Sequence, residues 1–592
     1  LANPAGNVTI NSGASGLLAL GSAGINAGSS IRTLALTSSV RLDAPQSWVT
    51  GSSGATGSAQ ISASGVISGP GGLAISAVDN RGVSLTGANT FAGGLTLGSG
   101  AILDYSTASA VVAADGGVTS SPFGTGPLTI NGGTLNAGNR NFFNPSVAIN
   151  GDFTWSTSSA RVDTGGSFNL GSGLRAISLT RPVTPANVVV SGGNNSIRFT
   201  VVTGGTAFNS FSNGSLKLAA AASVAAPNFV TATFGSSNRF TDNAGLVVGP
   251  RVYVSPSFTN APFGSSAAER PAVTLEAGAF LSLSDGGSGR GHAIFSLAGN
   301  GTVLNNTSGT GERTDTLTID GGIKTSTSEF SGSIRDTDTT TFPTANPNLR
   351  TALVKSGGTT QVLSGPCVYS GATMVNGGIL RITGSLANTS ALTIGSGGTF
   401  ENQASVSVSG DITNNGTLVL AGNATLAFTG AFTNNGVLDL TAWTGTLPAG
   451  IVNNGSILLP PGPEIFVNWQ SGTWPGNSDP NTIGPGADPD QDGTNNLLEW
   501  ALHLDPKLPD AFRPALANSG GVLEFTYARR KVAPGAAVYQ VEWSDTPGAD
   551  WSAATVVTDP PVPLSASEER VRATVPKGSA GRRFIRLKVT KP

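Results

Sequence analysis

The chain has 592 residues, 82 of them glycine, and a net charge of −2 from 32 basic and 34 acidic residues. This length exceeds one ordinary globular core, so we expect several domains or an extended array. The balanced charge without a basic stripe argues against nucleic-acid binding, and no apolar run reaches the roughly 18 residues that span a bilayer. The single cysteine, Cys367, excludes an intrachain disulfide and is expected to be a small buried hydrophobe.

Residues 1–463 have few charges and a pattern typical of ordered β structure. They carry 19 basic and 19 acidic residues, and their glycines fall at corners between short β-prone triplets. Segments 373–376 and 379–382 alternate with period two, so alternate side chains are expected to face inward. The register within 140–310 stays open. A Leu-Thr-Ile triplet followed by a glycine corner recurs at 128–130, 317–319 and 392–394.

The most regular repeat is Asn-Asn-Gly followed by a short apolar strand. It begins at Asn414, Asn434 and Asn453, at a nearly constant spacing. A fixed period of about 20 residues, turn plus strand, is typical of a solenoid whose coils stack on one another. We expect each glycine to supply a positive φ at a tight corner and the asparagines to hydrogen-bond along the stack. At about 20 residues per coil, the region 1–463 would hold roughly 20 coils.

Two longer segments have similar sequence patterns. Residues 83–94 are Val-Ser-Leu-Thr-Gly-Ala-Asn-Thr-Phe-Ala-Gly-Gly, and residues 365–380 are Gly-Pro-Cys-Val-Tyr-Ser-Gly-Ala-Thr-Met-Val-Asn-Gly-Gly-Ile-Leu. Both resemble autotransporter-associated β-strand repeats, whose usual form is Leu-Thr-Gly-x-Asn-x-aromatic-x-Gly-x-Thr-x-Val-x-x-Gly-x-Leu. The resemblance implies a right-handed parallel β-helix exported to the bacterial cell surface or beyond. The repeat family has no catalytic residues that could be assigned to this chain.

Charge and tryptophan content rise after residue 463. Residues 464–592 carry 13 basic and 15 acidic residues and five of the eight tryptophans. A Pro/Gly-rich stretch at 459–463, followed by further Pro-Gly breaks, indicates a domain boundary. We therefore expect a β-solenoid over 1–463 and a linker over 464–487, with no helix before residue 490.

Residues 488–499 match the calcium-loop pattern Asp-x-Asp-x-Asp-Gly-x5-Glu in full. Ca²⁺ needs six to eight oxygen ligands, and three close carboxylates repel one another unless a cation lies between them. Gly493 would permit the sharp turn. The expected ligands are Asp488, Asp490, Asp492, the backbone carbonyl of Thr494, Asn496 at the position that often binds through water, and Glu499.

A helix is expected to leave this loop over 495–503, but residues 482–486 cannot form the helix that enters an EF-hand. The motif therefore resembles a half EF-hand of the dockerin or thrombospondin type 3 kind. The alternative is an Asp-rich turn that caps a helix and binds no metal. We favour structural Ca²⁺ and assign residues 488–510 to a calcium loop and helix.

Residues 511–592 predict a small β-sandwich. Apolar and polar residues alternate over 522–527, 537–543, 570–575 and 583–589, which suits an immunoglobulin-like or fibronectin-like fold. The predicted fold class is thus all-β: a parallel β-helix, then a calcium loop with a helix, then a sandwich.

The residues needed for an enzyme are sparse. β-Helices that cleave polysaccharides need paired carboxylates, or a basic residue with Ca²⁺, on one face. The acidic residues before 464 are scattered, and the two histidines, His292 and His503, are expected in a loop and on a helix surface. We therefore expect no enzyme.

These observations predict an exported, non-enzymatic structural protein. It would be the subunit of an extracellular or cell-surface filament that assembles head-to-tail as a homopolymer, or a surface adhesin with a glycan as partner. The start at Leu1 rather than Met suits a mature, signal-cleaved protein or an excised fragment. The alternative is a secreted β-helix that binds or cleaves polysaccharide.

Overall fold

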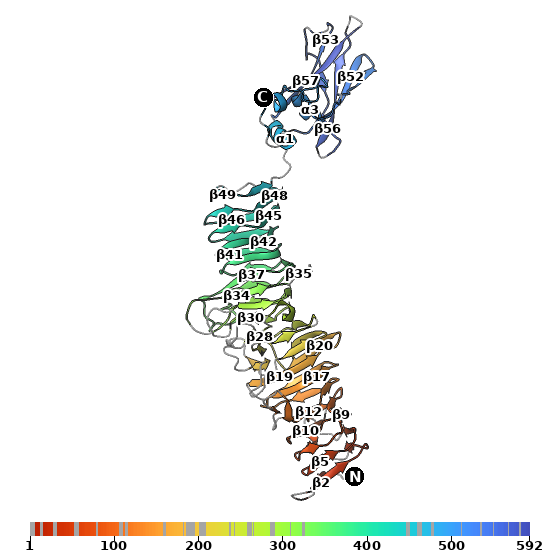
Figure 1. Cartoon of the computed structure of the whole chain (residues 1–592), viewed down its shortest axis with the longest axis vertical. Coiled ribbons are helices and arrows are strands. Elements are labelled where there is room, and N and C mark those ends of the chain that lie inside the picture. Colours follow the sequence, from red (N-terminus) through yellow and green to blue (C-terminus); the bar gives the residue numbers. More distant parts are fainter. Residues whose placement is uncertain are drawn as a thin grey trace. The chain divides into compact units, whose positions relative to one another are not determined.

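A computed structural model gives the structure of the chain, which divides into two compact units, Leu1–Leu458 and Leu459–Pro592 (Figure 1). The residues that the structure describes are 6–11, 13, 16–27, 32–51, 59–78, 81–105, 110–112, 117–157, 161–180, 183–184, 196–199, 209–235, 238–241, 243–256, 263, 266–284, 291–307, 310–321, 326–445, 450–458, 465–474, 477, 479–510, 512–532, 536–546, 548, 550–565, 567–578 and 582–591.

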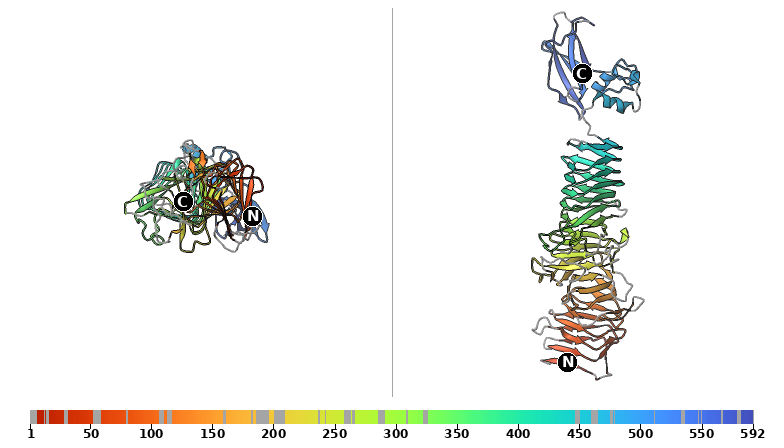
Figure 2. Two further views of the ribbon diagram at one scale, coloured as in Figure 1. Left: turned by 90° about the horizontal axis from the view of Figure 1, so that it is seen from below. Right: turned by 90° about the vertical axis from the view of Figure 1, so that its left-hand side faces the viewer.

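The first unit is a parallel β-helix, which confirms the predicted fold class. Its strands stack as successive rungs (Figure 2), and every described pairing between its strands is parallel except β13 with β14 and β21 with β25. One isolated antiparallel bridge joins Asn89 and Ser121. Most strands belong to two long sheets.

The strands of the first long sheet are β1 (Asn7–Ile10), β4 (Thr33–Leu36), β7 (Ala59–Ala63), β10 (Gly82–Leu85), β12 (Ile102–Asp104), β16 (Thr134–Asn136), β18 (Phe153–Ser156), β20 (Leu174–Leu179), β24 (Ser215–Ala220), β27 (Gly245–Val248), β29 (Ala272–Leu275), β31 (Gly291–Ile294), β32 (Ser296–Gly299), β34 (Arg313–Ile319), β35 (Thr327–Phe330), β37 (Leu349–Lys355), β38 (Thr360–Leu363), β40 (Thr373–Ile382), β42 (Leu392–Asn402), β44 (Ile412–Asn414), β45 (Thr417–Gly422), β47 (Phe432–Asn434), β48 (Val437–Trp443), β49 (Ile451–Asn453) and β50 (Ser456–Leu458).

The strands of the second long sheet are β3 (Ile25–Ala27), β6 (Gln46–Thr50), β9 (Leu73–Ala77), β11 (Leu95–Leu97), β15 (Leu128–Ile130), β17 (Phe142–Ile149), β19 (Arg161–Asn169), β21 (Val183–Thr184), β22 (Ser196–Phe199), β23 (Ser210–Ser212), β25 (Phe229–Phe234), β26 (Arg239–Phe240), β28 (Val252–Pro256), β30 (Phe280–Ser282), β33 (Thr302–Leu304), β36 (Ser333–Arg335), β39 (Pro366–Val368), β41 (Ser385–Thr389), β43 (Ser405–Val408) and β46 (Thr425–Phe428). Shorter elements are β2 (Leu17–Leu20), β5 (Ser39–Leu42) and β8 (Ile67–Ser68), the hairpin of β13 (Val111–Val112) and β14 (Val118–Ser120), and the 3₁₀ helix η1 (Ala267–Glu269).

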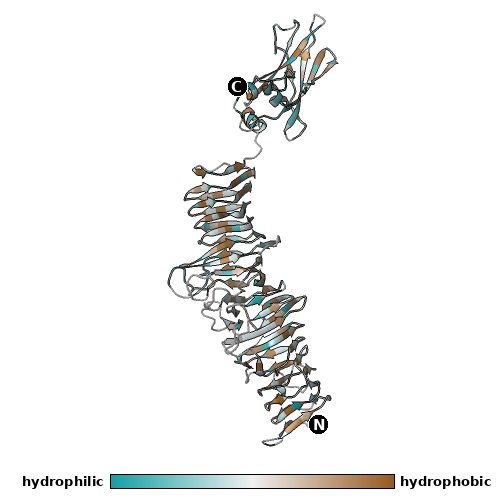
Figure 3. Cartoon of the chain, viewed as in Figure 1, coloured by the Kyte–Doolittle hydropathy of each residue, from teal (hydrophilic) through white to brown (hydrophobic). Residues whose placement is uncertain are grey.

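The coil length matches the prediction in the strict repeat and in some earlier coils, such as that from Thr134 to Thr154, but not throughout the β-helix. Ile412 pairs with Phe432, one repeat further along the chain, whereas the partner of Leu95 is Leu128, well over one repeat away. Apolar residues recur along the strands (Figure 3), and their inward side chains form one hydrophobic core through the stacked coils. Cys367 is completely buried in this core, as predicted, and burial raises the pKa of its thiol to about 12.

The Asn-Asn-Gly corners stack as expected, but the glycines act differently. Asn414 Nδ2 donates to Asn434 Oδ1 at 2.7 Å, one step of the predicted asparagine ladder. None of the three glycines has a positive φ, so that expectation is wrong. A Cβ on Gly436 would instead lie 2.1 Å from the carbonyl oxygen of Gly416. Glycine is needed because neighbouring coils approach closely.

The second unit contains helices α1 (Phe466–Thr473), α2 (Pro480–Ile483) and α3 (Asn496–Leu502) and two antiparallel sheets. The expectation of no helix before residue 490 is therefore wrong. The Pro/Gly-rich stretch 459–463 lies outside the described residues. One sheet contains β51 (Ala515–Ser519), β52 (Val522–Arg530), β54 (Val557–Thr558), β55 (Val562–Pro563) and β56 (Glu568–Pro576), and the other β53 (Val538–Ser544) and β57 (Phe584–Thr590).

The two sheets share a core around Phe525, Val541 and Val571, so they form the predicted sandwich. A second core holds α1 and α3 together through Phe466 and Trp500, whose ring centroids are 5.6 Å apart. Within the described part of the chain, no helix is long and apolar enough to cross a membrane.

Candidate metal centre

The predicted calcium loop lies between α2 and α3. One oxygen from each of Asp488, Asp490 and Asp492 lies within 4.8 Å of the others. The loop is curled by backbone N–H groups that donate to these carboxylates: Gly493 N to Asp488 Oδ2 at 3.0 Å and Thr494 N to Asp492 Oδ1 at 2.7 Å. Gly493 has a φ of 91°, the left-handed turn for which a glycine was expected.

Glu499 reaches the loop from the first turn of α3. The helix begins after Asn495, whose side chain accepts from Leu498 N at 3.1 Å and so caps it. Glu499 is completely buried, and neither of its carboxylate oxygens has a hydrogen-bond partner. Burial, followed by the charges of Asp490, Asp492 and Asp488, raises the pKa of Glu499 to about 8. The pKa of Asp490 is also raised, chiefly by burial.

A fifth carboxylate, Asp510, joins this cluster. Its backbone N donates to Asp492 Oδ2 and its Oδ2 accepts from Asp505 N, both at 3.0 Å. Its Oδ1 is buried without a partner, and its charge adds to the raised pKa of Glu499. Sequence reasoning missed Asp510 because it lies beyond the twelve-residue loop pattern, and no local motif marks it.

Asn496 is completely buried and holds the loop to the segment before it. Its Nδ2 donates to the carbonyl oxygens of Thr482 and Gly484, both at 2.9 Å, while its Oδ1 has no partner. Residues 482–484 thus lie against the start of α3, in place of a full entering helix. The structure brings Asp488, Asp490, Asp492 and Glu499 together. The side-chain amide of Asn496, expected as a ligand, donates hydrogen bonds to the backbone of the preceding segment.

The donor set suits a hard divalent cation. Oxygens of four carboxylates are buried and lack hydrogen-bond partners, which is costly unless a cation binds them. Carboxylate oxygens are the ligands that Ca²⁺ prefers, and Gly493 permits the tight loop that it needs. The residues therefore fit Ca²⁺. The unpartnered oxygens are Asp488 Oδ1, Asp490 Oδ2, Glu499 Oε1, Glu499 Oε2 and Asp510 Oδ1.

The loop is connected to both cores of the second unit. The carbonyl oxygens at the end of α3 accept hydrogen bonds from the sandwich: Trp500 O from Arg530 Nε at 2.7 Å and Ala501 O from Tyr539 at 3.2 Å. A cation held by Glu499 would therefore fix α3, and with it the packing of Trp500.

The histidines lie elsewhere. His292 is buried in β31, not in a loop as expected, and its Nε2 hydrogen-bonds to Leu283 O. His503 ends α3 with a φ of 60°, and its Nδ1 lies 3.2 Å from Glu568 Oε1.

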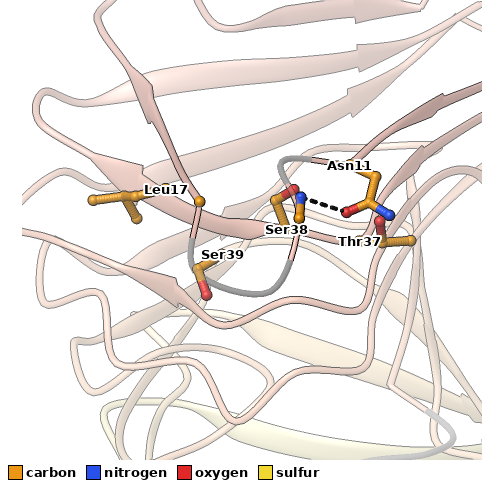
Figure 4. A pocket seen from close by; sticks show the side chains of 7 residues that line it. Asn11, Leu17, Thr37, Ser38 and Ser39 are labelled. Carbon is orange, nitrogen blue, oxygen red and sulfur yellow. Dashed lines mark hydrogen bonds between the residues drawn. The ribbon is translucent and has the colours of Figure 1, made fainter.

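A hollow of about 490 Å³ lies at the first coil, lined by polar side chains and by Leu17 (Figure 4). There Asn11 Oδ1 accepts from Gly13 N at 3.0 Å. The side chains that line it include no titratable group, so it supplies no acid or base.

No protein-family model, curated protein or solved structure was found to match the chain. The resemblance to autotransporter-associated repeats and to dockerin-type loops therefore stays a prediction.

Proposed function

We propose that the protein is an exported, non-enzymatic structural protein, the subunit of an extracellular or cell-surface filament. Copies would assemble head-to-tail through the ends of the β-helix. A structural Ca²⁺ at the acidic loop would hold the second unit in shape. Alternatively, the β-helix would present the second unit at the cell surface, where the protein would act as an adhesin.

The main evidence for this proposal is the edge formed by the last coil of the β-helix. β49 pairs with β47 and β50 pairs with β48, and among the described residues neither has a neighbour on its other side. Val452 and Leu458 on these strands are 53% and 44% exposed. An unpaired edge with exposed apolar side chains is a template for strands of another chain.

The first described coil offers a matching edge. β1, β2 and β3 each pair on one side, with β4, β5 and β6. Ile10 and Leu20 of this coil are only partly buried against the core. Two different edges on one molecule make a heterologous contact, which repeats into a filament when it does not close into a ring.

The carboxylates of the β-helix support a non-enzymatic role. Catalytic glycoside cleavage needs a pair of carboxyl groups facing a substrate. Here many are already held by a basic partner, among them Asp43 with Arg41, Glu276 with Lys217, Asp315 with Arg313, Asp320 with Arg270, Asp338 with Arg335 and Glu401 with Arg381.

The alternative of polysaccharide binding would use aromatic side chains on the outside of the coils. The described aromatic side chains of the first unit are buried or half-buried, and many stack inside the core, such as Phe168 on Phe211 with centroids 5.1 Å apart. This arrangement favours the structural role.

Sedimentation velocity over a concentration series tests the proposal. In calcium, the wild-type chain should form larger species as concentration rises, and Val452→Lys with Leu458→Lys should keep it monomeric. Both side chains are exposed, so the fold should survive the changes. The matched control is Val78→Lys, an apolar residue 70% exposed elsewhere on the β-helix, which should assemble normally. A wild-type chain that stays monomeric at every concentration overturns the proposal.

A further inference from the structure

The three Asn-Gly pairs at the end of the β-helix form a chemically reactive series. Asparagine followed by glycine is prone to lose ammonia, because no side chain hinders the attack of the glycine nitrogen on Cγ of the asparagine. Asn415, Asn435 and Asn454 are exposed and stand directly above one another on three successive coils.

The coils hold both reacting groups. Asn435 Nδ2 donates to Asn415 Oδ1 at 2.8 Å, and Asn454 Nδ2 donates to Asn435 Oδ1 at 2.9 Å. The attacking nitrogens are engaged as well: Gly436 N donates to Asn414 O and Gly455 N to Asn434 O, both at 3.0 Å. Attack requires the side chain to leave its ladder and the backbone bond to open.

The burial of the attacking glycine falls along the series. Gly416 is buried, Gly436 is half-buried and Gly455 is exposed. Within the described residues, the Asn435 side chain is bonded to a neighbour on each side, whereas that of Asn415 is bonded only to the following coil and that of Asn454 only to the preceding coil. The strands that flank Asn454, β49 and β50, are each paired on one side.

We propose that Asn454 is a deamidation site, that the ladder protects Asn435, and that the burial of the attacking Gly416 nitrogen protects Asn415. The Gly455 nitrogen forms a bond to Cγ of Asn454, the bond from Cγ to Nδ2 breaks, and the proton of the glycine nitrogen leaves with the amine as ammonia. Water then opens the succinimide to aspartate or isoaspartate. The net reaction is asparagine plus water to an acid plus ammonia, without oxidation or reduction.

The new carboxylate would place a negative charge on the last corner of the β-helix and break its bond to Asn435. Asn435 would then become the exposed end of the ladder. Deamidation should therefore proceed in the order 454, 435, 415.

Peptide mass spectrometry after incubation at mildly alkaline pH tests this. In the folded monomer, at concentrations below those of assembly, Asn454 should deamidate several-fold faster than Asn435, and Asn415 should be slowest. In the same chain in denaturant, the three rates should be similar, because each site is Asn-Asn-Gly. Equal rates in the folded protein, or Asn415 reacting first, would overturn the proposal.

The variant Asn454→Ala removes the ladder bond to Asn435 without changing the backbone. Deamidation at Asn435 should rise, while Asn415 should stay near its wild-type rate. An unchanged rate at Asn435 contradicts a protective role for the ladder.

Discussion

Asn434 donates from Nδ2 to Oδ1 of Asn453 at 2.6 Å, across one coil of the β-helix. The Asn434 side chain is completely buried, and its Oδ1 accepts from Asn414 Nδ2 on the preceding coil. Three coils are thus linked by side-chain amides as well as by the backbone. Because each buried amide satisfies the next, the ladder adds stability without leaving a polar group unpaired.

Replacing Asn434 with alanine should weaken these coils. The change leaves the Asn414 amide without its 2.7 Å acceptor in a buried site, which should cost about 1–3 kcal/mol. Native-state hydrogen exchange at β47 and β48 measures the loss as faster local opening. Asn435→Ala is the matched control, because that side chain is exposed and its loss should cost less than about 1 kcal/mol. Equal effects of the two variants would contradict a buried ladder.

Gly436→Ala tests the close approach of the coils. The new Cβ would meet the backbone oxygen of Gly416 at 2.1 Å, so the coils must separate. We expect a loss of about 1–3 kcal/mol, measured as a lower denaturant midpoint for the first unit. Gly21→Ala is the control, since a Cβ there meets nothing within 4 Å and the midpoint should not move.

The acidic loop should bind Ca²⁺ through carboxylates from both sides of α3. Asp490→Asn and Asp510→Asn should each weaken binding by at least about tenfold in isothermal titration calorimetry, since each removes charge from the cluster. Asp550→Asn makes the same change at an exposed site of the second unit and should bind normally. Normal affinity in Asp510→Asn would remove that residue from the ligand set.

Without metal, the second unit should become less stable as pH rises. The pKa of Glu499 is raised from 4.5 to about 8, so the folded state holds its proton more tightly than the unfolded state does. This contribution is complete below pH about 4.5 and is lost as pH rises through about 8. In chelator, the Tm of the second unit should fall across this range, and Glu499→Gln should flatten the fall. A Tm that rises with pH in chelator would contradict the buried, unpaired carboxyl.

The sequence predicted the fold where local pattern and coil length agree. The Asn-Asn-Gly spacing matches the register of Ile412 with Phe432, because each coil there contains one turn phrase per repeat. It could not predict the register earlier in the chain. Leu95 pairs with Leu128, so the coil between them is much longer than one repeat. The local pattern of apolar residues does not show how many extra residues a coil contains.

The sequence predicted those residues of the candidate site that lie within one loop. The residues of one loop appear as one motif, but Asp510 joins through the tertiary fold and shows no spacing signal. The helix α1 was missed because Ile465 precedes it without a capping side-chain bond and Pro-Gly breaks surround it. Its burial of Phe466 and Trp469 against Trp500 stabilises it instead.

Negative-stain electron microscopy of the purified chain tests the structural role most directly, first in calcium and then in chelator. Because the proposed contact is made by the ends of the β-helix, the proposed role predicts long unbranched filaments in calcium, and these should persist when the metal is removed from the loop at Asp488–Glu499. Isolated single particles under both conditions, at concentrations where the folded protein is intact, would contradict it.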